Sequence, residues 1–235
     1  MAASRLPGKP MADIGGAPMI VRVLRQAQAA GVGPVVVAAG DAEIAWAVES
    51  AGGRAILTDP DLPSGSDRVL AALAEIDPDE QHDVVVNLQG DIPFLDPDLL
   101  AGCVWVLKAE PACDIATLIA PEGSPAERHD PDCPKAIVTL DPTGRMARAH
   151  YFTRSTLYGD GPVWRHIGVY AYRRDALARF AAAPPSPLER REKLEQLRAL
   201  ELGMSIWAAV APVMPMEVNT PAELAAACAY AEQNP

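Results

Sequence analysis

Short apolar runs alternate with helical patterns along the first ninety residues, and this alternation limits the fold more than any other feature. Residues 35–39 and 84–88 are nearly continuous apolar runs, which are typical of strands buried on both faces of a sheet. The apolar stripe of residues 18–30 predicts a helix that ends at Gly31. Helix and strand signals that alternate at this spacing indicate βαβ units, and hence an α/β fold with a parallel sheet.

The same criteria predict the remaining elements. We expect helices over residues 41–50, from residue 64 onward, and over 96–109, 188–202 and the C-terminal Ala-rich segment. Strands are expected over residues 54–58, 114–120, 136–140, 149–152, 164–172 and 205–211, and a polar surface loop over 122–134.

The composition limits the class of partner. The chain has 235 residues, of which 49% are hydrophobic, so it has enough apolar material for one large domain or two small ones. Its net charge of −11 argues against nucleic acid as a partner, but a local basic cleft would still bind a small anion. No apolar run approaches the roughly 18–20 residues that a membrane span requires, and no signal peptide is apparent, so we expect no membrane partner.

The cysteines predict the compartment. Cys103, Cys113, Cys133 and Cys228 show no CxxC spacing and lie in otherwise ordinary elements. Thiols in this pattern are typical of a reducing environment, and we therefore expect a cytoplasmic protein.

Two cations lie in a stiff segment near the N-terminus. Arg5 and Lys9 are held by Pro7 and Pro10, and Gly8 between them is free to adopt a positive φ. A Lys, an Arg and backbone N–H groups together suit a polyphosphate. The alternative is a solvated basic terminus. The segment is not a Walker loop, because a proline follows the Gly-Lys pair where that motif has Ser or Thr.

A carboxylate follows the clearest strand. Residues 84–88 lead into Gln89-Gly90-Asp91, and open sheets bind ligands at the carboxyl ends of their strands. With a basic loop at the same crevice, Asp91 is a candidate ligand for Mg²⁺, which takes few protein oxygens and completes its shell with phosphate and water. The alternative is an aspartate that only stabilises a turn.

Two other patterns have both a structural and a functional interpretation. Ser64 and Gly65 open a helix, where a serine is ordinarily an N-cap and where spare donors also suit an anion. In the alternating strand over 164–172, His166 and Tyr170 share one face, whereas Arg165 points to the other. Judged alone, such groups are usually satisfied members of a core.

Taken together, these segments resemble the 3-deoxy-manno-octulosonate (Kdo) cytidylyltransferases, also called CMP-Kdo synthetases. The resemblance covers nearly the whole chain, and its motifs recur in family order. They are Arg5-Leu6-Pro7-Gly8-Lys9-Pro10, Ser64-Gly65-Ser66-Asp67-Arg68, Gln89-Gly90-Asp91, Phe152-Thr153-Arg154-Ser155, His166-Ile167-Gly168-Val169-Tyr170, Leu194-Glu195-Gln196-Leu197-Arg198 and Val218-Asn219-Thr220-Pro221.

The resemblance implies a fold and an assembly. We expect one domain over residues 1–235 with the α/β, Rossmann-like nucleotidyltransferase (nucleotide-diphospho-sugar transferase) fold. Its sheet would be mixed and mostly parallel, with helices on both faces. The family is dimeric, so we expect a homodimer that uses roughly residues 120–175. The family also has a strand ahead of the position of Met1, and we therefore expect the natural start to lie upstream. The alternative is a real truncation, which would cost stability and one phosphate-binding Arg.

The implied reaction transfers CMP from CTP to the anomeric hydroxyl of Kdo and releases pyrophosphate, for lipopolysaccharide biosynthesis. The resemblance assigns catalysis to Arg5, Lys9 and Asp91, and nucleotide binding to Arg5, Lys9, Ser64, Gly65 and Gln89. It assigns sugar binding to Arg154, His166, Tyr170, Glu195 and Gln196, and Mg²⁺ binding to Asp91 and Asn219.

Two positions depart from the family pattern and leave alternatives open. Ile92 stands where the family has Glu, and Asn219 stands where the family has the second acidic metal ligand. These changes are compatible with a related sugar acid as substrate, such as 8-amino-Kdo or a sialic-acid-like sugar. They are also compatible with an inactive family member that acts as a binding protein.

Overall fold

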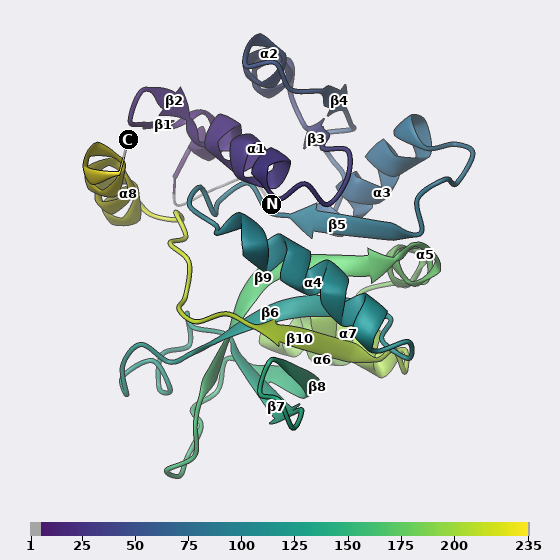
Figure 1. The fold of residues 1–235 in the computed structure, drawn as a ribbon, viewed down its shortest axis with the longest axis vertical. Coiled ribbons are helices and arrows are strands. Elements are labelled where there is room, and N and C mark those ends of the chain that lie inside the picture. The colour runs from purple at the N-terminus through teal and green to yellow at the C-terminus, as the bar shows by residue number, and fades with distance from the viewer. Residues whose placement is uncertain (1–5, 235) are drawn as a thin grey trace. The chain divides into compact units, whose positions relative to one another are not determined.

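The computed structural model describes residues 6–234 (Figure 1), so the predicted phosphate-binding Arg5 lies outside the described residues. The chain divides into two compact units. Unit 1 comprises residues 1–80, 88–98 and 215–235, and unit 2 comprises residues 81–87 and 99–214. The expectation of a single domain over the whole chain stays a prediction.

Unit 1 is built from short strands and four longer helices in its described part. Its elements are η1 (Lys9–Met11), β1 (Asp13–Ile14), β2 (Ala17–Pro18), α1 (Met19–Ala29), β3 (Val37–Ala39), α2 (Ala42–Ser50), β4 (Ala55–Leu57), α3 (Gly65–Ile76) and α8 (Pro221–Gln233). β1 and β2 form an antiparallel hairpin, and β3 pairs with β4 in parallel. The helices predicted over residues 18–30 and 41–50 are confirmed.

The C-terminal helix packs on the N-terminal part of unit 1. Figure 1 shows α8 beside the β1–β2 hairpin, and one buried cluster joins Ile14 and Met19 to Val218 and Ala227. Because these apolar side chains lose their contact with water together, the two ends of the described chain stabilise each other.

The apolar run over residues 35–39 is less buried than predicted. The strand is limited to Val37–Ala39, and within it Ala39 is buried while Val37 and Ala38 are half-buried. Within the described residues, β3 belongs to a two-stranded sheet with β4. Such a sheet covers less of each strand than a large sheet between helix layers.

Unit 2 contains a six-stranded sheet with the order β5-β9-β6-β10-β8-β7. Its elements are β5 (Val84–Leu88), α4 (Pro97–Ala109), β6 (Ile115–Pro121), β7 (Lys135–Leu140), β8 (Met146–Thr153), β9 (Trp164–Arg173), α5 (Arg174–Ala182), α6 (Pro187–Glu192), α7 (Gln196–Glu201) and β10 (Ile206–Val210). The first residues of α4 and the last residue of β5 are counted with unit 1. Residues 122–134 form turns, as predicted.

The sheet is mixed, but parallel pairing is less prominent than predicted. β10 and β6 pair in parallel, whereas β6–β9, β10–β8, β7–β8 and β7–β9 are antiparallel. Since β7 contacts both β8 and β9, five strands close into a ring of pairings. β6 is one of these five strands, pairs with β9 and β10, and is buried along most of its length.

Helices cover both faces of the sheet, as predicted. Figure 1 shows α4 in front of the sheet and α6 and α7 behind it. A Cβ added at Gly102 of α4 would lie only 3.5 Å from the Cβ of Ala209 in β10, so the helix approaches the strand closely. No helix of the described residues is both long and apolar enough to cross a bilayer.

The single helix predicted over residues 188–202 is wrong, because the segment forms two short helices. α6 begins with a capping box between Ser186 and Glu189 and ends at Lys193, which adopts a left-handed conformation with φ of 56°. The N–H of Lys193 donates to the carbonyl of Glu189 at 2.7 Å, which terminates the helix. α7 then begins anew at Gln196.

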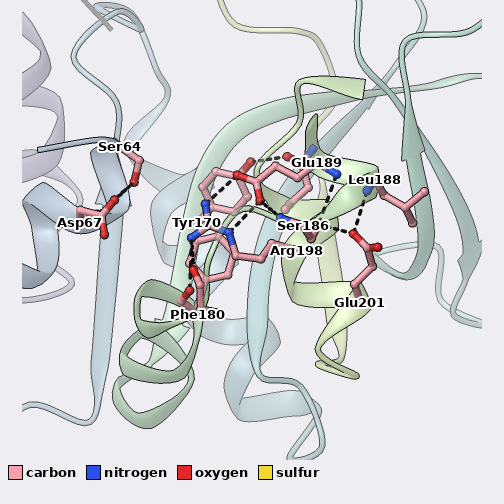
Figure 2. Close-up of polar contacts among 11 residues, drawn as sticks. Ser64, Asp67, Tyr170, Phe180, Ser186, Leu188, Glu189, Arg198 and Glu201 are labelled. Atoms are coloured by element: carbon pink, nitrogen blue, oxygen red, sulfur yellow. Dashed lines mark hydrogen bonds and ion pairs between the residues drawn. The ribbon is translucent and has the colours of Figure 1, made fainter. Parts of the chain in front are cut away.

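A buried ion pair holds the two short helices together (Figure 2). Arg198 of α7 donates from Nη2 to Glu189 Oε1 at 2.6 Å and from Nε to Oε2 at 2.8 Å. Its Nη1 also reaches the carbonyls of Phe180 and Ala183 at 3.3 and 3.2 Å. Burial raises the pKa of Glu189, but the hydrogen bonds from Arg198 and from the Ser186 N–H outweigh burial and lower it overall. Arg198 therefore connects α5, α6 and α7.

We expect Arg198→Met to destabilise the protein by about 3–5 kcal/mol, because it leaves the Glu189 carboxylate buried without its partner. The side chains of this pair are only 6% and 10% exposed. Arg179→Met is the matched control, since Arg179 pairs with Asp114 but is 53% exposed, and such pairs contribute about 1 kcal/mol or less. Chemical denaturation of both variants checks this, and equal losses would contradict it.

Candidate functional site

In unit 1, one ammonium group joins three segments that lie far apart in the sequence. Lys9 Nζ donates to Asp91 Oδ2 at 2.9 Å and to Asn219 Oδ1 at 3.0 Å. The side chains of Lys9 and Asp91 are 18% and 19% exposed, so the pair is shielded from water on most sides. The predicted proximity of Lys9 and Asp91 is therefore present, and Asn219 lies with them.

The N-terminal segment fixes the position of Lys9. Gly8 has φ of 67°, as expected from its place between the two prolines, and it precedes the short helix η1. The N–H of Met11 donates to the carbonyl of Gly8 at 2.9 Å, and that of Ala12 to the carbonyl of Lys9 at 3.1 Å. A residue with a Cβ would be strained at this φ, so Gly8 permits the turn that directs Lys9.

Hydrogen bonds of the main chain fix the positions of Asp91 and Asn219. The N–H of Val218 donates to the carbonyl of Asp91 at 2.9 Å, which joins the two segments directly. The N–H of Asn219 donates to Glu223 Oε2 at 2.7 Å, next to the capping box that begins α8. A Cβ added at Gly90 would lie 3.2 Å from Ile20 Cδ1, so the absence of a side chain lets the Asp91 turn approach α1.

The two oxygen atoms of this cluster could act as ligands for a single hard cation. Asp91 and Asn219 direct a carboxylate oxygen and an amide oxygen at the same positively charged atom, Lys9 Nζ. Oxygen ligands of this kind, few in number, fit Mg²⁺ when phosphate and water complete its shell. The described residues contain no group of three or more His, Cys, Asp or Glu that could hold a metal by themselves. Asp91 and Asn219 are thus compatible with Mg²⁺ only together with a substrate.

The other nucleotide-binding candidates lie on exposed or capping positions. Ser64 is the N-cap of α3, and its Oγ accepts from the N–H of Asp67 at 3.2 Å and donates to Asp67 Oδ2 at 2.6 Å (Figure 2). Gly65 is the first residue of that helix, and Gln89 is exposed after β5. The capping interpretation of Ser64 is therefore confirmed, while the nucleotide contacts of Ser64, Gly65 and Gln89 stay predictions.

In unit 2, three of the five predicted sugar-binding residues touch one another. His166 and Tyr170 share one face of β9, with ring centroids 5.5 Å apart. Gln196 of α7 joins them: its Nε2 lies 3.5 Å from His166 Nδ1, and its Oε1 accepts from the Tyr170 hydroxyl at 3.3 Å. The break between α6 and α7 is what places Gln196 at the start of a separate helix there.

Thr117, which the sequence did not single out, determines the tautomer of His166. Its Oγ1 lies 2.8 Å from the carbonyl of Val169 and 3.0 Å from His166 Nε2. Because a hydroxyl has one proton and the carbonyl only accepts, the Thr117 proton goes to Val169. His166 must then donate from Nε2 to Thr117 and accept at Nδ1 from Gln196. Both ring nitrogens thus have partners within the protein, and the ring orients the Gln196 amide.

His166 is held in its neutral form. Burial and, to a lesser extent, the positive charge of Arg154 together lower its pKa from 6.5 to about 3. A neutral imidazole is what the tautomer above requires, since only the neutral ring has an acceptor nitrogen.

The charge of Arg154 has no carboxylate partner among the described residues. Its Nη1 donates to the carbonyl of Pro131 at 2.9 Å, while its Nε is buried without a hydrogen-bond partner. Its main-chain N–H donates to Glu192 Oε2 at 3.0 Å, an oxygen that also accepts from Thr153 Oγ1 at 3.1 Å. A guanidinium that lacks a counter-ion suits an incoming carboxylate.

Glu195, the remaining sugar-binding candidate, lies directly before α7 and is half-buried. Among the residues that the sequence did not identify are Thr117, Glu192 and Lys135, whose contacts organise His166 and Arg154. Residue type and spacing carry no signal for them, because each lies in an element without a motif around it.

Comparison with solved structures identifies the class of protein. The chain superposes on an apo UDP-glucose pyrophosphorylase with a TM-score of 0.70 and 13% identity, covering 100% of this chain and 96% of that one. It superposes on a CMP:2-keto-3-deoxy-manno-octonic acid synthetase complexed with CTP with a TM-score of 0.90 and 36% identity, covering 99% and 95%. The fold is therefore the predicted α/β fold of the nucleotide-diphospho-sugar transferases.

The sequence comparisons specify the family. The chain matches the cytidylyltransferase family over residues 1–206. It is 58% identical over 225 residues to the 3-deoxy-manno-octulosonate cytidylyltransferase of Parvibaculum lavamentivorans, covering 95% of this chain and 86% of that protein. The chain belongs to the 3-deoxy-manno-octulosonate cytidylyltransferase family, as its motifs indicated.

The buried His166 predicts a pH dependence of stability. Its folded pKa lies below its unfolded value of 6.5, so the unfolded chain binds the proton more readily as the pH falls. The stability that the neutral His166 contributes is fully present above pH 6.5 and is lost as the pH falls towards about 3. We expect the stability of the wild type, relative to His166→Gln, to fall by about 2 kcal/mol between pH 7.5 and 5. Denaturation curves at both pH values check this, and a constant difference would contradict it.

Proposed function

We propose that this protein transfers CMP from CTP to the anomeric hydroxyl of Kdo and releases pyrophosphate. Membership of the family supports the reaction. The observation that carries the proposal is the contact of Lys9 with Asp91 and Asn219, because it unites a phosphate-binding cation with two oxygen ligands. The product would serve lipopolysaccharide biosynthesis, and a cytoplasmic location goes with the use of CTP.

The residues of unit 1 would act on the triphosphate. In this reaction the sugar hydroxyl displaces pyrophosphate at the α-phosphorus, so catalysis depends on positioning and on neutralising charge. Lys9 would stabilise the negative charge of the departing pyrophosphate, and we assign the same role to Arg5. Asp91 and Asn219 would hold Mg²⁺, which shields the phosphate charge and lowers the pKa of the sugar hydroxyl when bound.

The amide of Asn219 limits how much positive charge the site attracts. With Asp91 as the single carboxylate against Lys9, the cluster carries no net negative charge of its own. A second cation would therefore gain little from this cluster, and most of the attraction for Mg²⁺ must come from the triphosphate. We infer that metal and nucleotide bind together.

The residues of unit 2 would recognise the sugar acid. Arg154 would bind the carboxylate, because its guanidinium has a buried Nε without a partner and forms no ion pair with a carboxylate of residues 6–234. Tyr170, Gln196 and Glu195 would bind sugar hydroxyls, and His166 would hold the Gln196 amide in place. Since His166 is neutral, it does not compete with Arg154 for the carboxylate.

We also propose a homodimer that uses residues of the 120–175 region. The support for this proposal is the resemblance of this region to the dimer-forming part of the family.

The test of the function is pyrophosphate release from CTP and Mg²⁺ with a panel of sugar acids. We expect release with Kdo, and weaker release with 8-amino-Kdo and with a sialic acid. Preference for one of the latter two would replace the proposed substrate. No release with any sugar acid, from a folded protein that binds CTP, would favour a binding protein over an enzyme.

Asp91→Ala should abolish turnover while it leaves the fold intact, because it removes the carboxylate that accepts from Lys9 and would bind the metal. Asp98→Ala is the matched control, since Asp98 is exposed near the start of α4. Rates of CMP-Kdo formation and thermal melts of both variants check this. Full CMP-Kdo production by Asp91→Ala would remove Asp91 from the mechanism.

A further inference from the structure

Lys135 at the start of β7 is a completely buried lysine, with 0% of its surface exposed. Lysine is rarely buried to this extent, because removing the ammonium from water has a large cost unless the group is well paired. That cost is visible here, since burial lowers the pKa of Lys135. Its position therefore requires an explanation from its contacts.

Main-chain carbonyls are the partners of this ammonium. Lys135 Nζ donates to the carbonyl of Asp130 at 2.5 Å and to the carbonyl of Arg154 at 3.2 Å. Among the described residues it forms no ion pair with a carboxylate. Lys135 therefore joins two segments of main chain, the turn at 130–131 and the end of β8.

These are the same two segments that hold Arg154. The guanidinium of Arg154 donates from Nη1 to the carbonyl of Pro131, which follows Asp130 directly. The peptide of Arg154 is bound on its carbonyl side by Lys135 and on its N–H side by Glu192 Oε2. Lys135 thus connects the main chain of Arg154 to the turn that orients its guanidinium.

The orientation of this guanidinium matters for the sugar-binding cluster. The charge of Arg154 lowers the pKa of His166, so it acts on the cluster formed by His166, Tyr170 and Gln196. An arginine side chain has many rotamers, and binding a carboxylate with it is weaker if that freedom is lost only on binding. Anchoring both ends of Arg154 beforehand removes part of this cost.

We propose that Lys135 is a positioning residue for the sugar acid: by binding the carbonyls of Asp130 and Arg154, it holds the Arg154 guanidinium ready for the substrate carboxylate. This assignment rests on the proposed function, in which Arg154 binds the carboxylate of Kdo.

The first measurement separates the two substrates. We expect Lys135→Met to raise the KM for Kdo about tenfold or more, the effect of losing about one hydrogen bond to a charged group, while the KM for CTP stays within about twofold. Lys108→Met is the matched control, because Lys108 is exposed near the end of α4, and both its KM values should equal those of the wild type.

The second measurement asks whether Lys135 acts through Arg154. Arg154→Ala alone should raise the KM for Kdo, and adding Lys135→Met to it should cause little further change. Residues that act on the same contact are non-additive, whereas a general structural role would add its full effect in either background. Glu192→Ala removes the hydrogen bond to the main-chain N–H of Arg154. It should likewise raise the KM for Kdo and leave the KM for CTP unchanged.

Each outcome bears on the assignment. An unchanged KM for Kdo in folded Lys135→Met, equal changes for Kdo and CTP, or additivity with Arg154→Ala would overturn it. Should thermal melts show that Lys135→Met does not fold, Lys135→Gln decides by the same criteria, because it keeps a polar donor in the interior but removes the positive charge. A wild type that is inactive with Kdo would overturn the proposed function and this assignment with it. If the wild type is active and Lys135→Met has the same KM for Kdo, only the role of Lys135 is overturned.

Discussion

The shared interaction of Lys9 with Asp91 and Asn219 is the constraint on which the candidate site of unit 1 depends. It joins residues up to 210 positions apart, in a place where water reaches less than a fifth of the Lys9 and Asp91 side chains. In such surroundings an unpaired charge is costly, so the cation and its oxygen partners stabilise one another's positions. In a chain with a net charge of −11, this makes a local centre where positive and negative groups balance. A centre of this kind repels an anionic ligand less than a uniformly acidic surface would.

In unit 2, the buried side chains of His166 and Lys135 are stabilised by neutral hydrogen-bond partners. Thr117 and Gln196 satisfy both nitrogens of the buried His166 ring, and burial together with the charge of Arg154 lowers its pKa and keeps it neutral. Lys135 carries its ammonium into the interior and meets main-chain carbonyls there, and Arg154 retains a charge without a carboxylate partner among the described residues. The unit therefore has a positive charge that no carboxylate of the described residues neutralises, beside a neutral hydrogen-bonding cluster. That combination suits a polyhydroxylated acid, whose carboxylate and hydroxyls need different partners.

Much of the fold and part of the site could be predicted from the sequence. The helix of residues 19–29, the positive φ of Gly8 and the turn that ends in Asp91 depend on neighbouring residues, and their patterns were sufficient. The proximity of Lys9 and Asp91 followed from the rule that sheets bind ligands at the carboxyl ends of strands. The single helix predicted over 188–202 was wrong, because Lys193 adopts a left-handed conformation, which is uncommon for lysine, and its N–H ends the first helix on the carbonyl of Glu189. The burial predicted for the strand over 35–39 was too high, because burial depends on which elements cover a strand.

The sequence by itself determined the caps, the turns and the family, since these depend on residues within a few positions of one another or on motifs in a set order. Only the tertiary structure decided that Lys135 is buried against the main chain of Arg154, and that Thr117 selects the tautomer of His166. The physical reason is that the cost of burying a charge, and the proton position on a ring, depend on partners brought close by folding. Adjacent residues in the sequence do not specify those partners.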